Sequence, residues 1–209
     1  MATTLPDRNS FETAYAGLAP WDIDKPQQKL IDVADQISGS LLDAGCGTGE
    51  NALFFAARGC TVTGFDFLEE PIRRARQKAT ERDLDVKFLV KDARTLKDWN
   101  ERFDNAIDSG LFHVFSDEDA QTYVDGLWSV LKPGGRLFLL CFSDAEPGTQ
   151  GPRRISKQMI YDRFSEGWTV ESIEPVRFDV RSELQGLIFS EDGPKAWFAI
   201  IRREPAGSR

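Results

Sequence analysis

Three glycines at alternate positions occupy one short stretch, residues 41–49, with the sequence Leu-Leu-Asp-Ala-Gly-Cys-Gly-Thr-Gly. Its apolar start is typical of a strand buried in a parallel sheet, and the strand would end at Asp43. Glycine lets the backbone turn sharply and approach a ligand closely, because it carries no Cβ. Residues 51–58 then fit a helix that stops at Gly59. Strand, turn and helix together predict half of a nucleotide-binding βαβ unit.

The spacing of the glycines indicates which ligand the turn accepts. A dinucleotide site needs G-x-G-x-x-G, with the pyrophosphate over the helix N-terminus. Here the glycines stand at Gly45, Gly47 and Gly49, and Glu50 follows. A carboxylate at that helix end would repel a phosphate, whereas it would tolerate or attract a cation. The spacing therefore opposes a nicotinamide oxidoreductase.

A further acid, Asp66, ends the next expected strand, residues 61–65. An acid about twenty residues after the glycines is where nucleotide folds hold a ribose by its hydroxyls. Such a charge-assisted hydrogen bond contributes about 1.5–3 kcal/mol. Asp66 thus predicts a ligand that contains a nucleoside, but it does not distinguish a dinucleotide from another nucleoside cofactor.

The pattern D-x-G-x-G-x-G at residues 43–49 resembles motif I of the class I methyltransferases, which use S-adenosylmethionine. That cofactor carries a sulfonium and an ammonium group and no phosphate. Further motifs follow in the family's order: Asp66, a third strand at 86–90, a fourth at 103–109 and the turn Leu-Lys-Pro-Gly-Gly-Arg-Leu at 131–137. The resemblance covers residues 41–142 and implies contacts to the cofactor from Asp43, Gly45, Gly47, Gly49, Asp66, Phe67, Asp92, Ala93, Asp108 and Ser109.

The same resemblance implies the fold. It is an α/β fold with a Rossmann-like seven-stranded sheet of order 3-2-1-4-5-7-6, strand 7 antiparallel, and helices on both faces. Composition alone supports only the α/β class. A chain of 209 residues with 41% hydrophobic content is long enough for one domain with a full core. We expect this domain to span residues 24–209.

Residues 1–23 should form a separate N-terminal segment that either packs on the domain as a cover or acts as a lid over the substrate. The stretch Pro-Trp-Asp-Ile-Asp-Lys-Pro-Gln at 20–27 resembles a signature of small-molecule methyltransferases related to the thiopurine and thiol enzymes. In those enzymes the tryptophan approaches the cofactor, so Trp21 joins the cofactor-binding residues that the resemblance implies. Asp24 is expected to cap the helix that follows.

His113 is the only histidine in the chain, and it lies in a loop at 111–115 after the fourth strand. Ser116 begins a helix there as its cap. Ligands of open α/β sheets bind beyond the carboxyl ends of the strands, so this loop should face the transferred methyl group. An imidazole titrates near neutral pH and can take a proton from a phenol. His113 is therefore a candidate catalytic base, and the alternative is that it only supports the loop.

Five further residues are candidates for substrate binding. An arginine pair in the long loop 143–155 would hold an anionic group or pair with surface acids, and the aromatic side chains would form a wall or belong to the core. The candidates are Tyr15, Phe112, Phe115, Arg153 and Arg154. Aromatic residues beside a histidine favour an aromatic hydroxyl as the acceptor.

Composition limits the partners and the location. The net charge of −8 opposes nucleic acid, which is bound by clustered Lys and Arg. The three cysteines are widely spaced without a metal-ligand pattern, so we expect a reducing compartment and no metal. No signal peptide or membrane-spanning run is visible. We expect a cytoplasmic protein without a membrane partner, and the oligomeric state is not readable.

The expected function is transfer of a methyl group from S-adenosylmethionine to a small-molecule acceptor, leaving S-adenosylhomocysteine. The preferred acceptor is the hydroxyl of a phenolic or heterocyclic aromatic compound. The resemblance also includes thiol, thiopurine and halide methyltransferases, so these acceptors stay open. A module that binds the cofactor without catalysis would keep Asp43, Gly45, Gly47 and Asp66 as well.

Overall fold

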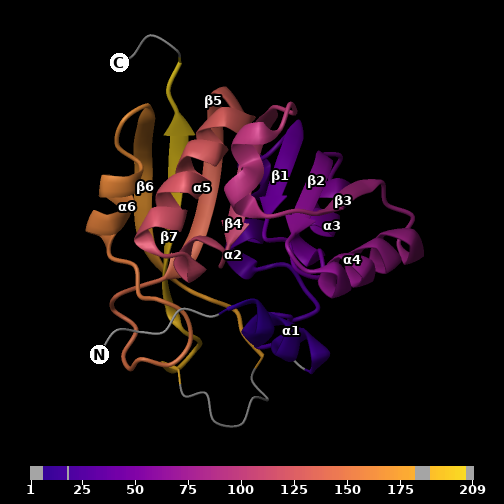
Figure 1. Cartoon of the computed structure of the whole chain (residues 1–209), viewed down its shortest axis with the longest axis horizontal. Helices are drawn as coiled ribbons and strands as arrows, with labels where there is room; N and C mark the ends of the chain where they lie inside the picture. Colours follow the sequence, from indigo (N-terminus) through magenta and orange to yellow (C-terminus); the bar gives the residue numbers. More distant parts are fainter. Residues whose placement is uncertain (1–6, 18, 182–188, 206–209) are drawn as a thin grey trace.

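One seven-stranded sheet organises the protein in a computed structural model that describes residues 7–17, 19–181 and 189–205. The strand order is β3-β2-β1-β4-β5-β7-β6 (Figure 1). Strand β7 runs antiparallel to both of its neighbours, β5 and β6. The predicted order and the antiparallel seventh strand are confirmed. The strands are β1 (Ser40–Ala44), β2 (Thr61–Asp66), β3 (Val86–Val90), β4 (Phe103–Ser109), β5 (Leu131–Phe142), β6 (Trp168–Arg177) and β7 (Lys195–Arg203).

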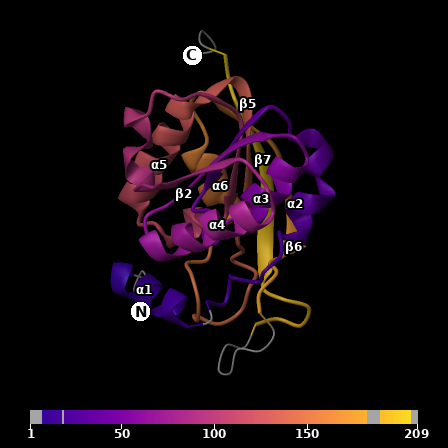
Figure 2. The same cartoon turned by 90° about the vertical axis from the view of Figure 1, so that its right-hand side faces the viewer.

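Helices cover both faces of the sheet (Figure 2). Side chains of α2 (Gln28–Asp32), α3 (Glu50–Ala57) and α4 (Glu69–Glu81) enter one core, and those of α5 (Asp117–Val130) and α6 (Lys157–Arg163) enter the other. Successive residues of a strand point to opposite faces. Accordingly, Phe138 of β5 lies in the first core and Leu139 in the second. The sheet is thus buried on both sides, as its apolar strands predict.

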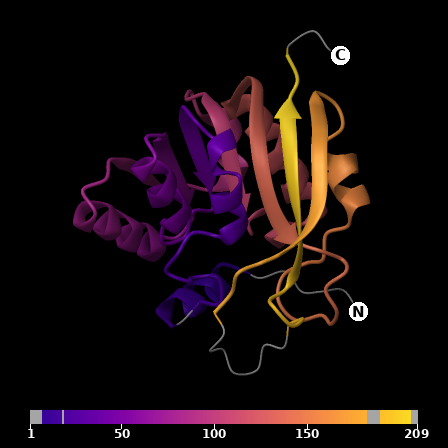
Figure 3. The ribbon, with the colours of Figure 1, turned by 180° about the vertical axis from the view of Figure 1, so that it is seen from behind.

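The carboxyl ends of β1, β2 and β4 meet at one edge of the sheet, and they end in Ala44, Asp66 and Ser109. Helix α1 (Arg8–Ala16) lies beyond this edge, with the loop after β5 beside it (Figure 1). Seen from behind, the segment after β6 reaches the same end of the molecule (Figure 3). Three short 3₁₀ helices complete the fold: η1 (Ala34–Gln36), η2 (Ala93–Asp98) and η3 (Phe112–Val114).

Two local predictions were wrong. The stretch 131–137, expected to be a turn before the fifth strand, lies within β5: Leu131 already pairs with Phe103, and a bulge that contains Pro-Gly-Gly follows. Asp24 does not cap a helix: α2 begins later, at Gln28, and Asp24 has a positive φ of 55°. Its carboxylate accepts a hydrogen bond from Arg181 at 2.8 Å, so a tertiary contact replaces the local one.

Candidate active site

A cavity of about 60 Å³ lies between the glycine turn and the N-terminal segment. It brings together six of the residues singled out from the sequence: Tyr15, Trp21, Gly45, Gly47, Gly49 and Ser109. Gln27 and Phe178 also line it. Gln27 is buried, and its side chain exchanges hydrogen bonds of 2.9 Å with the backbone of Asp179. The cavity wall therefore joins the start of the chain to the segment after β6.

Tyr15 covers the middle of the glycine turn. A Cβ on Gly47, whose φ is +52°, would lie only 2.8 Å from the Tyr15 hydroxyl. The indole nitrogen of Trp21 donates a hydrogen bond of 2.9 Å to that hydroxyl, and the two rings meet edge to face. Tyr15 is buried, whereas Trp21 is 38% exposed. The N-terminal segment thus closes over the turn with two aromatic side chains.

Asp66 ties the end of β2 to the same turn. Its two carboxylate oxygens accept hydrogen bonds from the backbone amides of Gly47 at 3.2 Å and Leu68 at 3.0 Å. The side chain is buried, and burial raises the pKa of Asp66 to about 6 despite these hydrogen bonds.

Two further acids, Asp43 on β1 and Asp108 on β4, are buried near Asp66. Burial raises the pKa of Asp43 to about 7, and the charges of Asp108 and Asp66 add to the shift. Oδ2 of Asp43 has no partner among the described residues. Burial also raises the pKa of Asp108 to about 6. Three buried carboxyls at neighbouring strand ends favour a ligand with positive charge.

Asp108 also fixes the loop that carries His113. Its oxygens accept hydrogen bonds from the amides of Leu111 at 2.9 Å and Phe112 at 3.0 Å, and from the hydroxyl of Tyr123 at 2.9 Å. The carboxylate is fully buried. These contacts give Asp108 a structural role in the loop, and its predicted contact with the cofactor stays a prediction.

Glu50, which we expected to tolerate or attract a cationic ligand, is paired with two cationic side chains of the protein. Lys78 donates to its carboxylate at 2.8 Å, and Arg82 donates at 2.8 and 2.9 Å. Although burial raises the pKa of Glu50, hydrogen bonds from Arg82 and Lys78 hold it below its usual value. Its charge is balanced within the protein, and attraction of a cationic ligand by this carboxylate stays a prediction.

Helix α4 binds the N-terminal segment through hydrogen bonds from its basic side chains. Arg74 donates to the backbone carbonyl of Tyr15 at 2.8 Å. Lys78 donates to the hydroxyl of Thr48 at 3.1 Å, and that hydroxyl donates to Asp22 at 2.7 Å. The sequence could have indicated Asp22 and Thr48 as binding partners, because both are polar and each adjoins a predicted cofactor-binding residue, Trp21 or Gly47.

Three of the residues expected to contact the cofactor, Phe67, Asp92 and Ala93, are not among those that line the cavity. Asp92 caps η2 by accepting from the amide of Arg94 at 2.9 Å, and it pairs with the guanidinium of the same residue. Ala93 is buried. Phe67 packs edge to face on Phe11 of α1, with ring centroids 5.5 Å apart. The predicted roles of Phe67, Asp92 and Ala93 in cofactor binding are not tested by these contacts.

His113 lies on the other side of the loop, behind Gly110. Its Nδ1 accepts a hydrogen bond of 3.0 Å from the backbone amide of Phe142. The ring is 5% exposed and packs against Phe142 and Phe178. Burial, with a smaller effect from the charge of Arg154, lowers the pKa of His113 to about 3. The imidazole is therefore neutral at physiological pH.

The two phenylalanines of this loop point away from His113. Phe112 and Phe115 are separated by one turn of η3, so they lie on the same side of it. Phe112 packs on Phe164, and Phe115 packs on Tyr123. Both contacts belong to the core under α5 and α6. No contact places either ring at the cavity, and their role in substrate binding stays a prediction.

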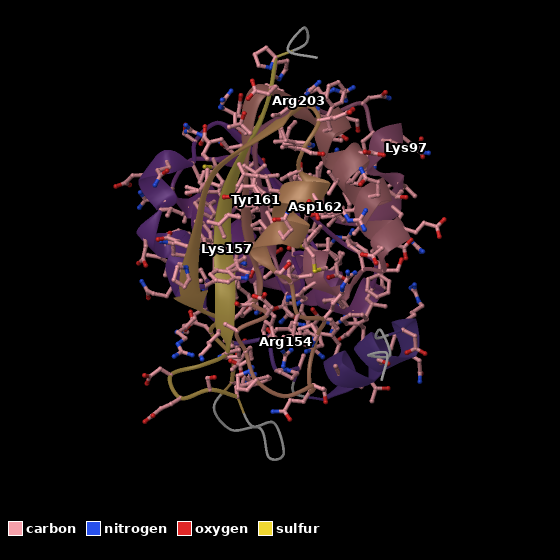
Figure 4. The ribbon with its side chains drawn as sticks, turned by 90° about the vertical axis from the view of Figure 1, so that its left-hand side faces the viewer. Lys97, Arg154, Lys157, Tyr161, Asp162 and Arg203 are labelled. Atoms are coloured by element: carbon pink, nitrogen blue, oxygen red, sulfur yellow. The ribbon has the colours of Figure 1, made fainter. Side chains whose placement is uncertain are left out.

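The arginine pair is engaged within the protein. Arg153 donates to the carbonyl of Phe115 at 3.2 Å and to the carboxylate of Asp117 at 2.6 Å. Arg154 lies in the loop after β5 (Figure 4) and donates only to backbone carbonyls, which are those of Glu146, Pro147, Gly148, Gln150 and Pro152. These contacts order the loop. Direct contact with a substrate stays a prediction for both residues.

The described residues contain neither a metal-binding cluster nor a membrane-spanning helix. No group of three or more His, Cys, Asp or Glu side chains in this part of the chain could hold a metal ion. None of the helices described here combines the length and the apolar character needed to cross a membrane.

Known proteins are similar to this chain in sequence and in fold. The family model "Methyltransferase domain" matches residues 41–135. The 2-heptyl-1-hydroxyquinolin-4(1H)-one methyltransferase of Mycobacteroides abscessus is 33% identical over 213 residues, which cover 96% of this chain and 92% of that protein. This chain belongs to the S-adenosylmethionine-dependent methyltransferases. The predicted family is confirmed.

Solved structures of other proteins have the same fold as this methyltransferase. A structure reported for the conversion of a disulfide bond into a thioacetal group during echinomycin biosynthesis is 34% identical, with a TM-score of 0.80, and covers 94% of this chain and 89% of that one. The N-methyltransferase NodS from Bradyrhizobium japonicum, with bound S-adenosyl-L-homocysteine, is 22% identical with a TM-score of 0.73. It covers 94% of this chain and 98% of that chain, and the likeness shows the fold alone.

The site suits the cofactor of the family. S-Adenosylmethionine carries a sulfonium and an ammonium group, and the strand ends offer three buried carboxyls, one of them with an oxygen free of any described partner. At Gly47 only the Tyr15 hydroxyl occupies the space that a Cβ would take. The methyltransferase therefore uses S-adenosylmethionine to methylate a small molecule.

Proposed function

We propose that this methyltransferase transfers the methyl group to the hydroxyl of a phenolic or heterocyclic aromatic compound. The observation that carries the proposal is the likeness, over nearly the full length of both chains, to a protein named for methylation of a hydroxyquinolone. The surroundings of the cavity support it, because Tyr15, Trp21 and Phe178 line it and Phe142 packs on Phe178 at 5.5 Å. Flat apolar walls of this kind suit an aromatic acceptor.

The bound cofactor supplies an activated methyl group on a sulfonium. The protein must then align the acceptor with the methyl carbon and keep water out. Such positioning contributes about 7–11 kcal/mol to the lowering of a barrier. In the proposed site Asp66 holds the ribose, Gly45 and Gly47 give the backbone its close approach, and the buried acids attract the cationic end. Tyr15 and Trp21, which lie over the glycine turn, exclude water from the cavity.

Thiols are the second candidate acceptors. The structure reported for conversion of a disulfide into a thioacetal is as similar to this chain as the hydroxyquinolone methyltransferase, at 34% identity. A thiolate is already nucleophilic near neutral pH, so a thiol acceptor would need no proton acceptor from the protein.

Mass spectrometry of reactions with S-adenosylmethionine tests the proposal. The purified protein is given phenols, hydroxyquinolines, alkyl and aryl thiols, and iodide, and methylated product is measured together with S-adenosylhomocysteine. The proposal predicts O-methylated aromatic products. Product from thiols or iodide alone would overturn the choice of acceptor. Tight binding of S-adenosylmethionine with no product would favour a non-catalytic module.

A further inference from the structure

The hydrogen bond between His113 and Phe142 fixes which ring nitrogen carries the proton. A backbone amide can only donate, so Nδ1 of His113 presents its lone pair to the amide of Phe142, 3.0 Å away. Because the ring is buried and neutral, its single N–H is at Nε2. The structure thus assigns His113 the tautomer that donates from Nε2.

This tautomer opposes the hypothesis that His113 is a general base. A base needs a lone pair on the atom that faces the acceptor, and Nε2 has none in this tautomer. Moving the proton to Nδ1 would set two N–H groups against each other across the bond to Phe142. That change would leave a buried amide without an acceptor, which disfavours the tautomer protonated at Nδ1.

Nε2 lies directly behind the wall of the cavity. A Cβ on Gly110 would lie 3.4 Å from Nε2 and 3.2 Å from the ring of Phe178. Phe178 and Ser109, the residue before Gly110, both line the cavity. Within the described part of the chain, His113 makes its hydrogen bond through Nδ1, and no residue accepts a hydrogen bond from Nε2. The donor is thus free to meet a ligand.

Arg154 places a positive charge near the imidazole of His113. Its hydrogen bonds go to neutral carbonyl groups, and its guanidinium lies over the ring of Phe142 at 5.4 Å from the centroid. Burial is the main cause of the lowered pKa of His113, and the charge of Arg154 lowers it further. Glu146 offsets part of this charge, but the Glu146 carboxylate accepts hydrogen bonds from the amides of Ser190 and Lys195. An anion beside Nε2 would meet one donor and one nearby cation.

We propose that the acceptor binds as a preformed oxyanion and that Nε2–H of His113 donates a hydrogen bond to its oxygen. This inference rests on the proposed function and narrows the substrate class to acidic hydroxyls, such as phenols with electron-withdrawing groups and N-hydroxy heterocycles. The hydroxyl loses its proton to solvent before or during binding. A lone pair of the oxyanion then forms the O–CH₃ bond, and the C–S bond breaks with its electron pair left on sulfur. No proton passes to the protein.

NMR of the single histidine tests the tautomer without any turnover. Protein labelled with ¹⁵N in histidine gives one imidazole, because the chain contains one histidine. We expect a protonated Nε2 and an unprotonated Nδ1 from pH 5 to pH 9, both in the unbound protein and with S-adenosylhomocysteine. A proton on Nδ1, or a titration with a midpoint near the ordinary pKa of histidine, would overturn the inference.

Two matched variants test the donor in catalysis. His113→Gln keeps an N–H near the position of Nε2 and loses the acceptor for Phe142, whereas His113→Asn keeps that acceptor and loses the donor. With an acidic phenol, His113→Asn should lower kcat/KM by about 10- to 100-fold, because one hydrogen bond to a charged group is lost. The kcat/KM of His113→Gln should stay within about threefold of the wild-type value. The reverse order would show that only the bond to Phe142 matters and would overturn the inference. Equal affinity for S-adenosylhomocysteine checks that both variants fold.

The pH profile distinguishes a preformed oxyanion from base catalysis. Across a series of phenols, the rise of kcat/KM with pH should move with the pKa of each phenol. A rise at one fixed pH for every phenol would reveal a base in the protein and overturn the inference. If no hydroxyl compound is methylated, the proposed function fails, while the NMR result still decides the tautomer.

Discussion

The indole nitrogen of Trp21 and the hydroxyl of Tyr15 are joined by a hydrogen bond of 2.9 Å directly above the glycine turn. Phe11 of α1 packs on the same tryptophan, with centroids 5.7 Å apart. Ligand pockets usually enclose about 300–1,000 Å³. The cavity under this cover measures about 60 Å³, so we expect the cover to move when the cofactor enters.

Trp21→Phe should therefore speed cofactor entry. The variant keeps an aromatic ring and loses the hydrogen bond to Tyr15, so the cover opens more readily. We expect the association rate of S-adenosylhomocysteine to rise severalfold in stopped-flow displacement of a fluorescent analogue. Tyr161→Phe, a change in an exposed aromatic residue of α6, is the control. Slower association in Trp21→Phe would indicate that Trp21 guides the ligand and does not gate it.

Asp66→Asn should weaken cofactor binding whatever the acceptor. The change removes the charge that would hold the ribose, and one hydrogen bond to a charged group contributes about 1.5–3 kcal/mol. We expect the Kd for S-adenosylhomocysteine to rise about 10- to 100-fold by calorimetry. Glu171→Gln, on the edge strand β6, should leave the Kd unchanged. An unaltered Kd in Asp66→Asn would refute the assignment of Asp66 to the ribose.

Binding of S-adenosylmethionine should release protons at pH 6 and not at pH 8. Burial raises the pKa of Asp43 to about 7 and that of Asp66 to about 6, so both are partly protonated at pH 6. A cationic ligand favours the ionised forms, which drives protons off and makes affinity rise with pH over this range. Calorimetry in buffers of different ionisation enthalpy measures the release. S-Adenosylhomocysteine lacks the sulfonium charge and should release fewer protons. Equal heats in all buffers at pH 6 would contradict the account.

His113 should make the protein less stable in mild acid. The folded-state pKa of His113 is lowered to about 3, whereas an unfolded histidine titrates near 6.5. The unfolded chain therefore takes up the proton first, and this contribution to stability is lost as pH falls below about 6.5. Relative to His113→Gln, the wild type should lose about 2 kcal/mol of unfolding free energy between pH 7.5 and pH 5, measured by urea denaturation. A constant difference between the two proteins would show that His113 is not buried as described.

The sequence predicted those parts of the fold that depend on neighbouring residues. Strand β1 follows from the apolar pair Leu41 and Leu42, and the start of α5 follows from Ser116, whose side chain accepts from the amide of Asp119. The glycine turn was recognisable because motif and conformation lie in one stretch, and Gly45, Gly47 and Gly49 all have positive φ.

What the sequence did not predict depends on contacts between distant segments. Glu50 is neutralised by Lys78 and Arg82, which stand 28 and 32 residues away on another helix. The tautomer of His113 depends on Phe142, 29 residues away at the end of another strand. A spacing rule describes one helix or strand at a time. It can therefore indicate that a charged side chain or an imidazole is present, but it cannot indicate the distant residue with which that group interacts.

Competition between two matched acceptors tests the central claim most directly. The protein is incubated with S-adenosylmethionine carrying a CD₃ group and equal amounts of 8-hydroxyquinoline and quinoline-8-thiol, and the labelled products are separated by mass spectrometry. The account predicts CD₃ on oxygen, with one S-adenosylhomocysteine formed per methylated product. CD₃ on sulfur alone would contradict it.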